Sequence, residues 1–423
     1  MPSWSINSLN RRQFFQAGAN LTLAGLLSEM IPGWVRKSLA DVPDLTTPNF
    51  VLFRTFGGMD VTLGLDPQVM PTGATETDLF LEYRPEDIIH AEGLRLGPAA
   101  AALAPLAKHC LVVNGVMMRR DAGHDVLSSY MTTGRGDGKA AAISAEIGLA
   151  TEMGPFGILM NNGMYLAGKS AIVSQTTELA TEANNETLSN LIEEKTKASI
   201  PSHTPLAEAE KAVLAARIKA QEFTRLLGEF SKKFEKLESI HILLAALATG
   251  ACYQAHIDLQ ASVFMDTHSN HEGGHLRGQK SIWDQVANFL NLLESTQGEW
   301  GKLLDFTTVM VISEFSRTPA LNAAKGKDHN PFTNSVLLAG RGLNGGKTVG
   351  KSRVIPEKQS KTRMPEHYAV PFNYQTGESA TSPTGASFFY PENVIRTVAK
   401  LYGDPASFKA VNLSLPVIPG IVV

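Results

Sequence analysis

Four predominantly apolar runs along the chain predict buried β-strands. They are residues 50–56, 110–114, 306–312 and 335–340. Each run is short, rich in β-branched or aromatic residues, and bounded by glycine or polar residues, as is typical of a strand buried on both faces of a sheet. Helical spacing is found instead at residues 98–108, 281–294 and 391–401. This alternation of strands and helices predicts an α/β fold with a mostly parallel central sheet.

The pattern changes between about residues 178 and 262, where helix-forming residues dominate and glycines are few. Thr204 followed by Pro205 is a typical helix start. We therefore expect a helical insertion at about 178–262 within a single domain of residues 41–423. The sequence leaves open whether this insertion is a lid, an interface for a partner or a covering layer.

The N-terminus resembles an export signal. Arg11 and Arg12 precede an uncharged run from residue 16 to 28, and Ser38-Leu39-Ala40 provides a small-x-small site. This order is typical of a twin-arginine signal peptide, here residues 1–40. The run is shorter than the roughly 20 residues that span a bilayer, and no other segment is long and apolar enough to do so. We expect a periplasmic or otherwise exported protein that uses the twin-arginine machinery as a partner.

Composition and charge argue against some classes of partner. The chain has 423 residues, 43% of them hydrophobic, and a net charge of -3 with acids and bases mixed throughout. The absence of a basic patch argues against nucleic acid as a partner. Cys110 and Cys252 lie in apolar surroundings, and their spacing requires no disulfide, so two buried thiols are expected. The glycines at 342–346 fit no phosphate-loop spacing and are interpreted as turns.

Ionisable residues gather where the apolar runs end. Asp60 follows the first run after two glycines, and His124 lies between the second run and a short helix. The stretch from residue 266 to 329 adds Asp266, His268, His271, Glu314, Asp328 and His329. Because the carboxyl ends of parallel strands meet at one edge of a sheet, these residues predict a metal-centred active site at that edge.

The same motifs, in the same order, carry a resemblance to a known family. They are Gly57-Gly58-Met59-Asp60, Gly123-His124, Asp266-Thr267-His268, Ser313-Glu314-Phe315-Ser316-Arg317-Thr318 and Lys327-Asp328-His329. The chain resembles, from about residue 48 to 403, the exported family called domain of unknown function 1501. That family is similar to the alkaline phosphatase and sulfatase superfamily. The resemblance implies an alkaline-phosphatase-like three-layer α/β sandwich.

The resemblance also implies roles for individual residues. Asp60 corresponds to the acid that binds metal after the first strand, and the Asp266–His329 stretch supplies the later ligands. His124 falls where the hydrolases carry a Ser, Thr or modified Cys nucleophile, and Ser128 and Ser129 lie about one helical turn further on. The usual covalent intermediate is therefore not expected.

The residue types leave other chemistry open. A divalent ion can lower the pKa of a water molecule toward ~7, so that water attacks directly. The carboxylate and imidazole set suits Zn²⁺ first, with Mn²⁺, Ca²⁺ and Mg²⁺ as alternatives. Arg317 and Arg120 are candidates for holding an anionic group, while Arg317 could instead be the buried partner of an acid. Asp328 is expected to orient His329.

Two hypotheses follow. In the first, the protein is an exported metal-dependent hydrolase of phosphate or sulfate esters on an anionic envelope substrate, with His124 and Arg317 as catalytic residues. In the second, it is a catalytically degenerate metal-binding or scaffold protein of the cell envelope, with the helical insertion as a surface for a protein partner. Metal content and ester hydrolysis distinguish the two.

Overall fold

The computed structural model describes residues 48–118, 123–135, 140–151, 154–162, 173–176, 179, 206–297, 301–380, 386–408, 411–412 and 414–423. The predicted signal peptide and the Thr204–Pro205 helix start lie outside these residues. Within the described residues, no helix has both the length and the apolar character needed to cross a membrane.

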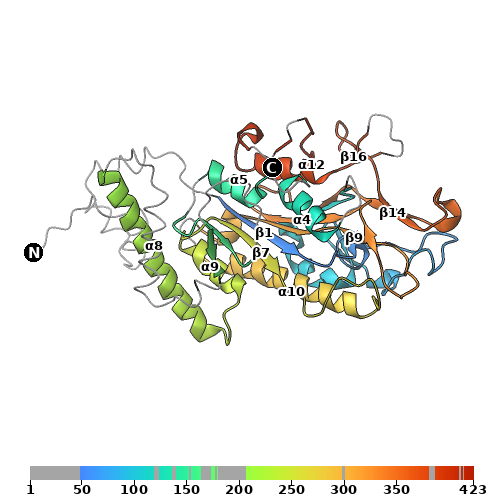
Figure 1. Cartoon of the computed structure of the whole chain (residues 1–423), viewed down its shortest axis with the longest axis horizontal. Coiled ribbons are helices and arrows are strands. Elements are labelled where there is room, and N and C mark those ends of the chain that lie inside the picture. The colour runs from blue at the N-terminus through green and yellow to red at the C-terminus, as the bar shows by residue number, and fades with distance from the viewer. Residues whose placement is uncertain are drawn as a thin grey trace, which may run out of the picture.

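An eight-stranded sheet forms the centre of the molecule (Figure 1). From one edge to the other, its strands are β12 (Lys347–Val349), β4 (Cys110–Asn114), β11 (Ser335–Gly340), β8 (Thr307–Ser313), β1 (Asn49–Thr55), β7 (Gln254–Leu259), β5 (Ile158–Met160) and β6 (Val173–Gln175). β11 is antiparallel to both of its neighbours, and every other pair in this sheet is parallel. The prediction of an α/β fold with a mostly parallel central sheet is confirmed.

Helices cover both faces of this sheet, which explains why every residue of β1 is buried. Val51 and Phe53 pack on the face covered by η4 (Pro98–His109), α9 (Ser239–Ala248) and α10 (Gly274–Ser295). Phe50 and Leu52 pack on the face covered by α4 (His124–Thr133), α5 (Ile143–Ala150) and α12 (Pro391–Lys400). Side chains alternate between the two faces of a strand, so a strand buried on both sides reads as a continuous apolar run.

The region predicted to be helical contains α8 (Leu206–Lys233) and α9. In Figure 1, α8 lies at one end of the molecule, beyond the sheet. The end of the region is different, because Gln254–Leu259 forms β7 next to β1. Its polar residues Gln254, His256 and Asp258 alternate with apolar ones at the two-residue period of a strand. All three are buried, and Asp258 forms a bidentate ion pair with Arg54 at 2.7 Å. This part of the helical prediction is corrected.

Shorter elements fill the connections. They are η2 (Val61–Leu63), η3 (Pro85–Asp87), β2 (Ile89–Ala91), β3 (Leu94–Leu96), α11 (Leu303–Phe306), β9 (Ser316–Arg317), β10 (His329–Asn330), β13 (Ser352–Ile355), η5 (Glu357–Gln359), β14 (Glu366–Ala369), β15 (Phe372–Asn373), β16 (Glu378–Ser379) and η6 (Pro405–Ser407).

The sheet topology brings distant segments to one edge. β1, β7 and β8 are parallel, and β4 runs in the same direction because both it and β8 are antiparallel to β11. The chain that follows each of these strands therefore emerges at the same edge, and the chain that leads into β11 also lies there. These connections carry Asp60, His124, Asp266, Glu314 and His329.

Candidate metal centre

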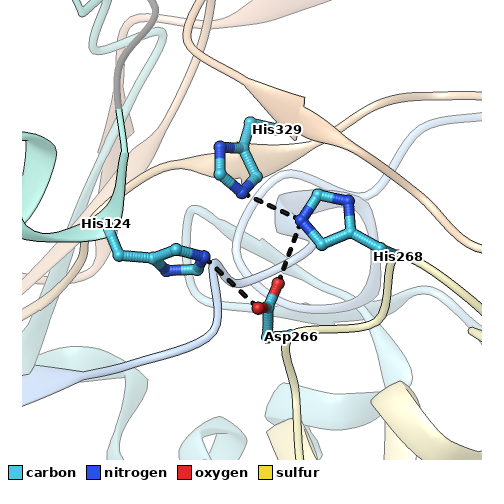
Figure 2. A group of neighbouring side chains, drawn as sticks. All are labelled: His124, Asp266, His268 and His329. Carbon is cyan, nitrogen blue, oxygen red and sulfur yellow. Dashed lines mark hydrogen bonds and ion pairs between the residues drawn. The ribbon is translucent and has the colours of Figure 1, made fainter.

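Three histidines surround the carboxylate of Asp266 (Figure 2). His124 Nε2 lies 3.4 Å from Asp266 Oδ2, and His268 Nε2 lies 3.2 Å from Asp266 Oδ1. His329 Nε2 is 3.1 Å from His268 Nε2. One ligand atom from each of the four residues lies within 4.8 Å of the others. A group of imidazole and carboxylate donors this close together could bind a divalent metal ion.

The local backbone explains how these side chains meet. His124 is the first residue of α4, and Asp266 and His268 lie in the connection after β7. His329, in β10, pairs with Arg317 of β9 just after β8. Gly57 has φ +94°, and a Cβ there would lie 2.8 Å from the backbone nitrogen of Asp266. The glycine therefore allows the connection after β1 to pass directly against the Asp266 segment.

Two of the histidines are oriented by carboxylates. His124 Nδ1 donates to Glu314 Oε1 at 2.5 Å, and His268 Nδ1 donates to Asp328 Oδ1 at 2.7 Å. Each pair leaves Nε2 facing the centre of the group, as in carboxylate–histidine–metal arrangements. The hydrogen bond to Glu314 also raises the pKa of His124. Asp328 was expected to orient His329, but in the structure it accepts the hydrogen bond of His268 instead.

His329 is held by packing. Its ring centroid lies 4.0 Å from that of Phe315, and the His124 and Phe315 centroids are 4.9 Å apart. Burial lowers the pKa of His329, with smaller contributions from His124 and Arg317. The neutral imidazole that a metal requires is therefore favoured. Phe315 belongs to a predicted motif, but its role as the surface on which two candidate ligands pack could not be seen from sequence.

Arg317 is a buried structural partner of Asp266. Its Nη2 donates to Asp266 Oδ1 at 2.6 Å, and its Nη1 donates to the Lys327 carbonyl at 2.9 Å. It also donates to the carbonyl of Gly57, and the side chain has 0% exposure. Although burial alone would raise the pKa of Asp266, Arg317 lowers it overall. The predicted role in holding an anionic substrate is corrected in favour of the buried ion pair.

Asp60 lies outside the Asp266 group and forms a second, buried cluster. Its Oδ2 accepts a hydrogen bond from Lys327 Nζ at 2.6 Å and lies 3.4 Å from His271 Nε2. Its Oδ1 accepts from the backbone and hydroxyl of Thr62. Burial opposes ionisation, but Lys327 and His271 bring the pKa of Asp60 well below its ordinary value. Lys327 thus supplies the positive charge that the sequence interpretation gave to a metal ion.

A directed series of hydrogen bonds fixes the proton on His271. The Asp60 N–H donates to His275 Nε2 at 3.0 Å, so the proton of His275 is on Nδ1, 3.0 Å from Thr267 Oγ1. The Thr267 hydroxyl then donates to His271 Nδ1 at 2.8 Å. His271 therefore carries its proton on Nε2, facing Asp60. Burial lowers the pKa of both histidines, that of His275 to about 3. Asp60 and His271, two predicted ligands, are thus assigned to structural positions.

Neither nearby serine is placed to act as a nucleophile. Ser128 and Ser129 are both buried in α4. Ser128 Oγ accepts from Arg54 Nη1 at 3.1 Å, and Ser129 Oγ donates to the Arg135 carbonyl at 3.1 Å. His124 is the residue of this helix that faces Asp266. Arg120, the other candidate for anion binding, lies outside the described residues.

A cavity of about 460 Å³ adjoins the Asp266 group and is lined in part by His124 and Asp266. Its size is within the range of about 300–1,000 Å³ that is typical of small-molecule sites. Two of the four candidate ligands, His124 and Asp266, are therefore accessible from a space that can hold a substrate.

One protein-family model matches part of the chain. Residues 164–368 match the family described as Protein of unknown function (DUF1501), in agreement with the resemblance of the motifs. No curated protein matches the sequence.

Several solved structures are similar at low identity. The crystal structure of Ps i-CgsB has 12% identity, covers 71% of this chain and 68% of its own, and has a TM-score of 0.33. The PsFucS1 sulfatase from Pseudoalteromonas sp. has 9% identity, covers 75% and 68%, and has a TM-score of 0.30. The PH0037 protein from Pyrococcus horikoshii has 11% identity, covers 70% and 89%, and has a TM-score of 0.27.

Proposed function

We propose that this protein is an exported metal-dependent hydrolase with an alkaline-phosphatase-like fold. The observation that carries the proposal is the convergence of three imidazole Nε2 atoms on the Asp266 carboxylate. In two of the three, a carboxylate accepts from Nδ1, which leaves Nε2 free to bind a cation. His268 Nε2 and His329 Nε2 lie 3.1 Å apart, a separation that requires a proton or a cation between the two nitrogens.

His124, Asp266, His268 and His329 would hold the ion. Three nitrogen donors and one oxygen donor suit Zn²⁺, and Mn²⁺ accepts the same set. When bound, such an ion would supply Lewis acidity, polarising the substrate and lowering the pKa of a water molecule.

The surrounding residues prepare this group for the reaction. Glu314 and Asp328 fix the ring orientation of His124 and His268. Arg317 holds Asp266 from the side that faces the core and keeps its carboxylate ionised. Phe315 excludes water from one side of His329. The open side is the cavity, from which a substrate and a water molecule can approach.

A phosphate or sulfate ester is the proposed substrate class. The family resemblance carries this part of the proposal, because the related hydrolases act on such esters. Arg317 is fully buried and donates its hydrogen bonds within the chain. The anionic group of a substrate would therefore be neutralised by the metal ion held at the Asp266 group and not by Arg317.

The second candidate is a catalytically degenerate metal-binding or scaffold protein of the cell envelope. The observation that favours it is the absence of an available hydroxyl nucleophile on α4, where His124 stands instead and both serines are buried. In that case α8, at one end of the molecule, would be the surface for a protein partner.

The proposed export of the protein rests on its N-terminal motif. The paired arginines and the small-x-small site support export through the twin-arginine pathway, with residues 1–40 as the signal peptide. An envelope polymer is then the substrate to which the protein has access.

Metal analysis combined with two esterase assays tests the proposal. Purified full-length protein is analysed for bound metals, loaded with Zn²⁺ or Mn²⁺, and assayed on an aryl phosphate and an aryl sulfate. We expect bound metal and turnover of at least one ester, both lost in His268→Ala. His90→Ala, which removes an exposed histidine of β2, is the matched control and should keep both.

The outcomes separate the two candidates. Absence of metal binding in the wild-type protein contradicts the hydrolase and the metal-binding form of the second candidate, and supports the scaffold protein. Metal binding without turnover of either ester contradicts the hydrolase and supports the degenerate metal-binding protein.

A further inference from the structure

The cavity beside the Asp266 group continues along the connection after β7. Its walls are formed by residues 259–265 and by Phe56, in addition to the two candidate ligands. A substrate whose ester lies at the Asp266 group therefore places the rest of its structure against this segment. The side chains that line the cavity indicate the chemical character of that remaining part of the substrate.

Phe56 forms a rigid aromatic wall. The Arg54 guanidinium carbon lies 4.4 Å from the centroid of the Phe56 ring. Arg54 is itself fixed by its bidentate pair with Asp258 and by its hydrogen bond to Ser128. Phe56 as a whole residue is still 37% exposed. A ligand can thus pack on a ring that is already held in place, with little loss of side-chain entropy.

A second aromatic ring lines the same cavity. Phe264 is 79% exposed, which is unusual for a large apolar side chain far from the chain ends. An exposed aromatic residue beside a candidate active site is typical of a surface that binds a ligand. Phe56 and Phe264 together give the cavity two aromatic surfaces.

The charges of the cavity exclude a polyanionic remainder. None of its lining residues is Lys or Arg, and its ionisable members are His124, Asp125 and Asp266. A neutral group with an apolar face fits these walls better than a second phosphate or sulfate.

A neighbouring cavity of about 640 Å³ has a different character. The two share the lining residues Leu259, Gln260 and Ser262, so they adjoin each other along this short segment. The lining of the second includes the amide, hydroxyl and acid side chains of Asn161, Glu238, Ser239, Ser281, Asp284 and Gln285. Such side chains suit a ligand with many hydroxyl groups.

We propose that the two cavities form one carbohydrate-binding groove. A neutral sugar ring packs its C–H face on Phe56 and Phe264, and the next sugar units reach the polar cavity. The inference rests on the proposed hydrolase function, because it places an ester of the sugar at the Asp266 group. An aryl or lipid group would fill the first cavity but would make no contact that uses the hydroxyl, amide and acid side chains lining the second.

Binding to immobilised oligosaccharides tests the groove without requiring turnover. Zn²⁺-loaded full-length protein is applied to an array of unmodified, sulfated and phosphorylated oligosaccharides, and affinities for the best binder are measured by calorimetry. We expect Phe264→Ala and Phe56→Ala to weaken binding by about ten-fold each, the size expected for the loss of an aromatic contact. Because Phe264 is exposed, its truncation leaves the core intact.

Two further variants make the result specific. Phe332→Ala removes a ring that is 43% exposed and lines neither cavity, so its affinity should match the wild type. His268→Ala lacks a candidate metal ligand but should still bind the unmodified oligosaccharide, which separates this inference from the hydrolase proposal. Absence of oligosaccharide binding by the wild type, or equal binding by the Phe56, Phe264 and wild-type proteins, overturns the groove. Binding of p-nitrophenol alone, without any sugar, overturns it in favour of an aryl pocket.

Discussion

His124 Nδ1 and Glu314 Oε1 lie 2.5 Å apart, although 190 residues separate them in the chain. The pair joins the first residue of α4 to the residue that follows β8, and Glu314 also accepts from the Gly57 backbone at 3.0 Å. Glu314 therefore connects the chain segments after three strands. It orients a candidate ligand without facing the centre of the ligand group.

Replacing Glu314 by Gln should weaken metal binding more than it alters the fold. The amide keeps an acceptor for Gly57 but loses the charge that polarises His124. Loss of such an orienting carboxylate typically costs about 10–100-fold in metal affinity. Calorimetric titration with Zn²⁺ measures the effect, and Asp125→Asn, an acid on the cavity wall outside the ligand group, is the matched control. Equal affinity for Zn²⁺ in Glu314→Gln and the wild type would contradict the assignment.

Arg317→Met should destabilise the protein strongly. The guanidinium is fully buried, and its removal leaves Asp266 and the carbonyls of Gly57 and Lys327 without their donor. Breaking one partner of a buried ion pair costs roughly 3–5 kcal/mol, and we expect the lower part of this range because Asp266 is partly exposed. Urea denaturation measures the change in the free energy of unfolding. Unchanged stability together with lost ester binding would restore Arg317 as an anion-binding residue.

Asp60 and Lys327 should behave as a coupled pair. Lys327→Met leaves a buried carboxylate uncompensated and should cost roughly 3–5 kcal/mol of unfolding free energy. In Asp60→Asn/Lys327→Met both charges are gone, so the double variant should be more stable than Lys327→Met alone. A double-mutant cycle from denaturation curves gives the coupling energy. If the two single effects simply add, the pair does not hold the cluster together.

The sequence predicts part of this site because its apolar runs identify several strands of the central sheet. Once β1, β4 and β8 point the same way, the polar residues after them must meet at one edge, and His124 and His329 do. Asp266 and His268 reach the same edge from β7, which the apolar pattern did not identify as a strand. The same reasoning placed Asp60 in the ligand group. It could not see that Lys327, far away in sequence, occupies the space beside the Asp60 carboxylate.

β7 shows a second limit of the pattern. Gln254, His256 and Asp258 give the segment an amphipathic appearance, yet all three are buried. Only the partner strand reveals why, since Arg54 on β1 neutralises Asp258. A polar residue in the centre of a sheet is predictable only together with the residue that satisfies it.

Asp66 should make the stability of the protein depend on pH in the direction opposite to most acids. Burial raises the pKa of Asp66 to about 6, against hydrogen bonds from Ser352 and Gln68. The folded state therefore prefers the neutral acid, and this contribution is full below the ordinary pKa of 3.8 and lost as pH rises through about 6. A displacement of this size corresponds to about 3 kcal/mol.

Asp66→Asn removes that penalty. The variant should match the wild type near pH 4 and unfold at a higher temperature than the wild type at pH 8. Glu86→Gln, which alters an exposed acid of η3, should show no such pH-dependent gain. A melting temperature of Asp66→Asn below the wild type at pH 8 would show that ionised Asp66 stabilises its surroundings.

Removal of the metal should lower the melting temperature. The four candidate ligands come from the connections after β4, β7 and β8, so an ion bound by them links parts of the chain that unfolding separates. Binding to the folded state alone stabilises it by about 4 kcal/mol when free metal is a thousand times above its Kd. Scanning calorimetry of metal-loaded and chelator-treated protein should show a shift of several degrees. His268→Ala should melt at one temperature in both conditions, while His90→Ala should keep the wild-type shift. If the wild-type protein retains a bound ion yet melts at the same temperature with and without chelator treatment, the ion is bound elsewhere and the Asp266 group is not its site.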